Sequence, residues 1–169
     1  MSQLSLSIES SLLVRDVTGE YRPANADEVL QAAQRLLGAQ LRGREVLTSP
    51  QAVRDFLRVK LGALEHEVFA VIHMDSQHRV IEYVEMFRGT VSQTSVYPRE
   101  IVKEALRLNA AVVILAHNHP SGSTLPSSED IELTRALTEI LAIIDVRVLD
   151  HLIVGEEIVA LTETGHHQP

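Results

Sequence analysis

The stretch from Ala116 to Asp130, AHNHPSGSTLPSSED, constrains the fold and chemistry of this chain more than any other. The uncharged, largely β-branched run from Val112 to Ala116 leads into it and predicts a buried strand that ends where His117 begins. Alternate residues of a strand share a face, so His117 and His119 can point the same way. Prolines and a glycine then predict a turn-rich loop, and a helix should begin near Ser127.

The strand end and the helix start can bring Asp130, in the first helical turn, to the two histidines. Two neutral imidazoles and one carboxylate, with a fourth position for water, are the ligand set of a catalytic zinc site. A lone histidine or a lone helix cap would carry little weight, but the combination has no structural purpose of its own. We therefore predict one zinc ion per chain, held by His117, His119 and Asp130.

The spacing of these residues resembles the JAMM signature of the JAB/MPN metallopeptidases, and the wording AHNHPSG is similar to the bacterial RadC branch of that family. The segments EMFRGTVSQTSVYPREIVKEALRLNAAVVILAHNHPSG and VRVLDHLIVG also resemble RadC, so the similarity covers roughly residues 45 to 160. The resemblance implies a mixed sheet flanked by helices, of the JAB/MPN and cytidine-deaminase-like kind. It also implies a zinc site at the end of a central strand, and a serine, here Ser127, that stabilises the oxyanion.

The same resemblance implies a glutamate that acts as acid/base on the attacking water. This glutamate lies at the start of the strand after the helix Pro50–Leu61. Glu67 stands in that place. Glu82 and Glu85 are its competitors, because they lie in the next strand pattern and acidic strand residues more often face solvent.

Three further side chains have two interpretations each. Ser127 is also a candidate helix cap, and if it serves the oxyanion then Ser128 or Thr124 would cap instead. His73 and His151 could support the metal ligands, although a histidine in a strand is more commonly a core or surface residue.

The amino-acid composition of the chain excludes several classes of function. Fifteen basic against 23 acidic residues give a formal net charge of -8, so a general electrostatic footprint for nucleic acid is missing. The absence of cysteine excludes disulfides, thiolate zinc sites and cysteine nucleophiles. Neither a signal peptide nor a long apolar run is present, so we expect a cytoplasmic protein that does not bind membranes. A peptide or protein substrate is the expected partner, and a homodimer stays open.

Apolar periodicity along the rest of the chain predicts a mixed α/β order without a strict repeat. Residues 1 to 44 are expected to form an N-terminal arm or loose hairpin followed by a helix. Residues 45 to 169 are expected to form the RadC-like JAB/MPN domain. The expected elements of the second part are helices from Pro50 to Leu61, from Pro98 to about Asn109 and after Ser127, and strands over Glu67–Met74, Val80–Phe87, Thr90–Val96, Val112–Ala116, Val146–Val154 and Ile158–Leu161.

Three functional hypotheses follow. The first is a zinc metallopeptidase that hydrolyses a peptide or isopeptide bond. The second is a DNA-repair-associated factor or metal-dependent nuclease, which the acidic composition and the histidine ligands disfavour. The third is an interaction module without activity, which would typically have lost metal ligands. The chain is most similar to short RadC-like proteins, which lack the N-terminal helix-hairpin-helix region of the long ones.

Overall fold

The computed structural model describes residues 12–17, 19–41, 49–89 and 95–169. The chain divides into two compact units, Met1–Gly38 and Ala39–Pro169. Within the described ranges, no helix is both long and apolar enough to cross a membrane.

The first unit contains an antiparallel hairpin of β1 (Leu13–Arg15) and β2 (Tyr21–Pro23), followed by most of α1 (Ala26–Leu41). This confirms the hairpin and the helix expected at this end of the chain. Asn25 caps α1, because its side chain accepts from the Glu28 N–H while the Glu28 carboxylate accepts from the Asn25 N–H.

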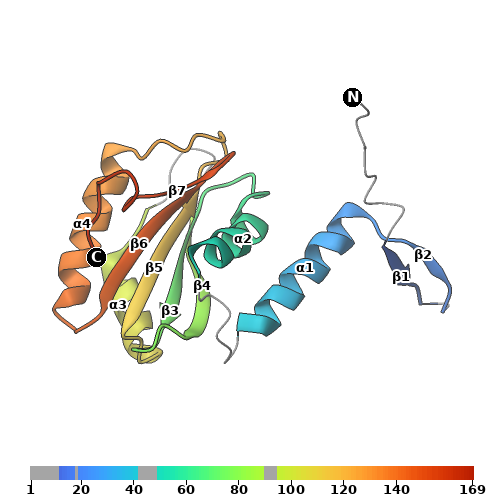
Figure 1. Cartoon of the computed structure of the whole chain (residues 1–169), viewed down its shortest axis with the longest axis horizontal. Coiled ribbons are helices and arrows are strands. Elements are labelled where there is room, and N and C mark those ends of the chain that lie inside the picture. The colour runs from blue at the N-terminus through green and yellow to red at the C-terminus, as the bar shows by residue number, and fades with distance from the viewer. Residues whose placement is uncertain (1–11, 18, 42–48, 90–94) are drawn as a thin grey trace. The chain divides into compact units, whose positions relative to one another are not determined.

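The second unit is built on one five-stranded sheet in the order β4-β3-β5-β6-β7 (Figure 1). Only the β5–β6 pair is parallel, and the other neighbours are antiparallel. Every residue of β3 and β5 is buried, which explains why both read as continuous apolar runs. The strands are β3 (Val68–Met74), β4 (Val80–Arg88), β5 (Val112–Asn118), β6 (Arg147–Val154) and β7 (Ile158–Ala160).

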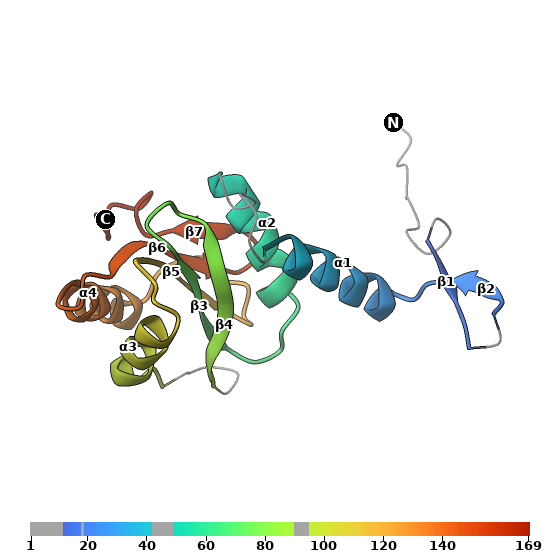
Figure 2. The same ribbon diagram turned by 90° about the horizontal axis from the view of Figure 1, so that it is seen from below.

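Helices cover both faces of this sheet (Figure 2). On one side lie α3 (Pro98–Arg107) and α4 (Ser128–Ala142), packed against side chains that include Phe69, Val71 and Leu115. On the other side lies α2 (Pro50–Leu61), which begins where the Ser49 hydroxyl accepts from the Ala52 N–H. Strand residues alternate between the two helical layers, so the position of a residue in β5 decides which layer it meets.

The mixed sheet flanked by helices is confirmed, and so are the helices that begin at Pro50 and Pro98. One expected strand, Thr90–Val96, falls mostly on residues 90–94, outside the described residues, and the described Ser95 and Val96 are not in a strand. Glu67 immediately precedes β3 rather than opening it.

Candidate metal centre and active site

The two histidines lie where β5 ends, beside its parallel neighbour β6. His117 is the second-last residue of β5, and its side chain is 1% exposed. Its backbone partners are Phe69 on β3 and Ile153 on β6. His119 follows the strand, and its N–H donates to the Val154 carbonyl at 2.9 Å. Both ring Nε2 atoms therefore meet on the α4 side, 2.9 Å apart, as the alternation predicts.

The loop after His119 is held against the β6–β7 turn. Gly122 has φ +81°, a conformation that favours glycine, and its carbonyl accepts from the Glu156 N–H at 2.9 Å. A Cβ at Gly155 would lie 2.5 Å from the carbonyl oxygens of Gly122 and Ser123, so this turn has no room for a side chain. The Ser123 carbonyl accepts from Nδ1 of His119 at 3.0 Å, which leaves the Nε2 lone pair of a neutral His119 for the site.

Asp130 enters the site from the first turn of α4, through a capping box. The Ser127 hydroxyl accepts from the Asp130 N–H at 3.1 Å, while the Asp130 carboxylate accepts from the Ser127 N–H at 2.8 Å. Ser127 is therefore the cap, and the alternative caps Ser128 and Thr124 are wrong. Its hydroxyl proton is directed to Oδ2 of Asp130 at 2.7 Å. Capping uses a lone pair and leaves the proton free to donate, so the two roles of Ser127 do not exclude each other.

The three side chains form a triangle of ligand atoms. Nε2 of His117 lies 3.2 Å from Oδ1 of Asp130, and Nε2 of His119 lies 3.7 Å from Oδ2. The 2.9 Å between the two nitrogens and these two separations, each to a different Asp130 oxygen, lie on either side of the edge of a zinc tetrahedron, about 3.3 Å for ligand distances of about 2.0 to 2.1 Å. In the described part of the chain, this is the group of His and acidic residues whose geometry suits a metal ion. The donor set and its spacing fit zinc.

Electrostatics in the site favours a bound cation. Burial would raise the pKa of the Asp130 carboxyl, but its interactions with the imidazoles of His117 and His119 outweigh burial and hold this pKa well below its usual range. The hydrogen bond to Asp130 in turn raises the pKa of His119, against the opposing effect of burial. The carboxylate is thus ionised and attracts positive charge, whether a proton on an imidazole or a metal ion.

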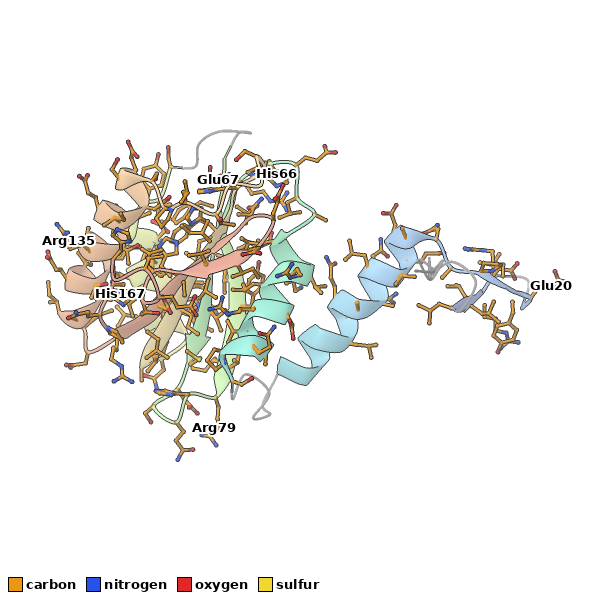
Figure 3. All side chains as sticks on the ribbon, turned by 45° about the horizontal axis from the view of Figure 1, so that its top comes forward. Glu20, His66, Glu67, Arg79, Arg135 and His167 are labelled. Carbon is orange, nitrogen blue, oxygen red and sulfur yellow. The ribbon has the colours of Figure 1, made fainter. Side chains whose placement is uncertain are left out.

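Of the three candidate glutamates, Glu67 alone lines the cleft into which these ligands open. Figure 3 shows it at one end of the sheet, beside His66, with Arg79 at the opposite end. Glu82 and Glu85 lie on β4, where their carboxylates pair with arginines 3.6 Å and 3.4 Å away. The geometry therefore favours Glu67 for any chemistry at the cleft.

The cleft has a volume of about 640 Å³. Its walls combine the ligands with apolar side chains and with carboxylates, and no lysine or arginine of the described ranges lines it. The apolar part of the wall is formed by Phe69, Val96, Pro120, Leu125 and Leu133. Such a mixture suits a polypeptide segment better than an anionic ligand.

Sequence reasoning missed Asn118, which lies between the two histidines but points to the opposite face of the sheet. It is 2% exposed, and its Oδ1 accepts from the Val68 N–H at 2.8 Å while its Nδ2 donates to the His66 carbonyl at 3.0 Å. These bonds hold the backbone on both sides of Glu67. The sequence offered one signal for it, a polar amide at the end of a strand whose first five residues are apolar.

His151 and His73, each of which could support a metal ligand or be a core residue, have different surroundings in the structure. His151 on β6 is fully buried and its Nε2 lies 2.8 Å from Nδ1 of His117, so it is both a core residue and a neighbour of a ligand. His73 on β3 is fully buried as well, and in the described structure neither ring nitrogen has a hydrogen-bond partner. His73 is therefore a core histidine.

Comparison with known proteins agrees with this geometry. A model of the RadC-like JAB domain matches residues 47–166. The chain is 56% identical to a UPF0758 protein of Leptothrix cholodnii, over 87% of this chain and 67% of the relative. UPF0758 proteins of Polaromonas sp. and Thiobacillus denitrificans are each 51% identical, over 87% and 88% of this chain and 66% of either relative. The chain thus spans about two thirds of the length of these relatives, and it belongs to the RadC-like JAB domain family.

Proposed function

We propose that this chain is a zinc-dependent hydrolase of the metallopeptidase or isopeptidase type. One observation carries the proposal, namely that the converging ligand atoms of His117, His119 and Asp130 open onto the same cleft as Glu67. Membership of the JAB domain family supports it, and the residues that the resemblance to the JAMM signature assigns are present in this sequence.

His117, His119 and Asp130 would hold a zinc ion, which would supply a Lewis acid to polarise a carbonyl and would lower the pKa of water to about 7. Glu67, half-buried at the cleft, accepts a proton from the attacking water and returns it to the leaving nitrogen. The C–N bond breaks after the new C–O bond has formed, the products are an acid and an amine, and the Glu67 carboxylate is restored.

Ser127 is the proposed donor to the oxyanion. Its hydroxyl already lies at the cleft, where it donates to Oδ2 of Asp130. Rotation of the hydroxyl about its Cβ–Oγ bond redirects the proton to a carbonyl oxygen as negative charge develops there. The capping bond from the Asp130 N–H keeps the oxygen in place during this rotation.

The cleft walls indicate the class of substrate. Leu125 is 78% exposed beside the ligands, and Val96 and Leu133 extend the apolar surface. Glu129 adds a carboxylate at the rim. We expect uncharged or basic side chains next to the scissile bond and discrimination against acidic ones. The same walls argue against a nuclease, because nothing cationic among the described lining residues would meet a phosphate backbone.

Zinc-loaded protein incubated with a proteome-derived peptide library, followed by identification of new amino termini, tests the proposal. Glu67→Gln should lower the cleavage rate by about 10² to 10⁴, because the proton acceptor is lost, while zinc content and melting temperature stay at wild-type values. Glu82→Gln and Glu85→Gln remove the same charge from β4 and should retain activity.

Two results would contradict the assignment. Full activity in Glu67→Gln, combined with a zinc-loaded but inactive Glu82→Gln or Glu85→Gln, would place the acid/base elsewhere. No new amino termini from the zinc-loaded wild type would reject the peptidase activity.

A further inference from the structure

A buried polar path joins two of the three ligands behind the site. From His117, the path runs from Nδ1 to Nε2 of His151 at 2.8 Å, and from Nδ1 of His151 to Oγ1 of Thr134 at 2.6 Å. The Thr134 hydroxyl then donates to the backbone carbonyl of Asp130 at 2.6 Å. It connects β5, β6 and α4, and the two inner residues, His151 and Thr134, are at most 1% exposed.

The donor and the acceptor of each hydrogen bond along this path can be assigned from the chemistry of the groups. The Asp130 carbonyl can only accept, so the single Thr134 proton is used there. The Thr134 oxygen must then accept from Nδ1 of His151. His151 is fully buried and its two hydrogen-bond partners are an imidazole and a hydroxyl, so no carboxylate offsets a charge there and the ring carries a single proton. With that proton on Nδ1, Nε2 of His151 has a lone pair and accepts from Nδ1–H of His117.

The result for His117 follows directly. A neutral imidazole whose proton is held on Nδ1 presents a lone pair on Nε2, which is the atom that faces His119 and Asp130. The opposite tautomer would place an N–H there, pointing into the ligand triangle. The path also fixes the plane of the His117 ring, because the ring is bonded at its far nitrogen.

We propose that Thr134 and His151 are positioning residues that hold His117 in the tautomer and orientation a metal ion requires. The proposal rests on the metal site of the proposed function, and it assigns to these two residues a role in metal affinity. Outer partners of ligating histidines commonly change affinity by about 10-fold to 100-fold.

The test substitutes the threonine, because Thr134→Val keeps the shape and removes both the donor and the acceptor. Zinc affinity, measured by competition with a chromophoric chelator, should fall by about 10-fold to 100-fold. Thr134→Ser, which keeps the hydroxyl, should bind close to wild type. Thr138→Val is the matched control: Thr138 lies one turn further along α4, its hydroxyl donates to the Thr134 carbonyl at 2.7 Å, and it touches no histidine of the path. Its zinc affinity should be unchanged.

A second measurement needs no metal and no activity. Long-range ¹H–¹⁵N spectra of the metal-free wild type report which ring nitrogen carries each proton, and we expect Nδ1–H on both His117 and His151. A proton on Nε2 of His117 with Nδ1 bare would overturn the proposal even if Thr134→Val failed to fold. Wild-type zinc affinity in a folded Thr134→Val would overturn it as well. If the wild type bound no zinc, the proposed function would fail, and the spectra would still decide the tautomer.

Discussion

Replacing Asn118 with leucine should release the backbone around Glu67 from the end of β5. The native amide accepts from the Val68 N–H at 2.8 Å and donates to the His66 carbonyl at 3.0 Å. Leucine has nearly the same size but can make neither bond. Val68 is fully buried, so its N–H would lose its partner without gaining water.

The loss of stability can be worked out from the two groups that lose their hydrogen-bond partner, the Val68 N–H and the His66 carbonyl. A buried donor or acceptor that loses its partner costs about 1 to 3 kcal/mol, so the unfolding free energy should fall by about 2 to 5 kcal/mol once the apolar gain of leucine is subtracted. At about 2 to 4 °C for each kcal/mol, the melting temperature should drop by about 4 to 20 °C. Because the loss is local, amide exchange at Val68 should accelerate more than exchange in the centre of β3.

Urea unfolding followed by circular dichroism measures the first quantity, and hydrogen exchange with mass spectrometry or NMR measures the second. Asn118→Asp is the informative companion, since one oxygen still accepts from Val68 while the other faces the His66 carbonyl. Acid should partly rescue this variant, because a protonated carboxyl can donate to that carbonyl. A melting temperature within 1 °C of wild type for Asn118→Leu would refute the reasoning.

Two further predictions concern the histidines. The purified protein should carry about one zinc per chain, which metal analysis would measure. His119→Ala and Asp130→Ala should lose the zinc while keeping most of the fold, as measured by circular dichroism. Unfolding of both variants would instead make the metal structural. Burial lowers the pKa of His73 to about 4, so the unfolded chain binds this proton more tightly. The stabilisation is complete above pH 6.5 and falls by about 3 kcal/mol as pH drops to 4, and urea titrations of His73→Leu should lack that part of the pH dependence.

Local spacing was enough to predict that the three candidate ligands lie together. Whether His117 and His119 share a face depends only on the two-residue period of a strand, and Asp130 only on a capping pattern at the start of a helix. The mixed sheet could be predicted for the same reason, because the apolar periodicity of each segment indicates whether that segment forms a helix or a strand. The neighbours of the ligands could not be predicted in this way.

His151 is 34 residues from His117 in sequence, and their contact depends on the parallel register that pairs Leu115 with His151 and His117 with Ile153. Nothing in either segment specifies that register by itself. The bonds from Asn118 to the segment before β3 depend likewise on an antiparallel pairing 50 residues apart. The expected strand at Thr90–Val96 has β-branched residues typical of a strand, but the described Ser95 and Val96 lead directly into α3.

The double use of Asp130 has a thermodynamic consequence for metal capture. Its carboxylate is already bonded to the N–H and hydroxyl of Ser127, so the freedom of this side chain is lost when α4 forms and not when an ion arrives. His119 is likewise held by the Ser123 carbonyl before any ion is present. Little ordering remains to oppose binding, so calorimetric titration should show a small conformational entropy loss and a small heat-capacity change, unlike metal-induced folding of a zinc finger.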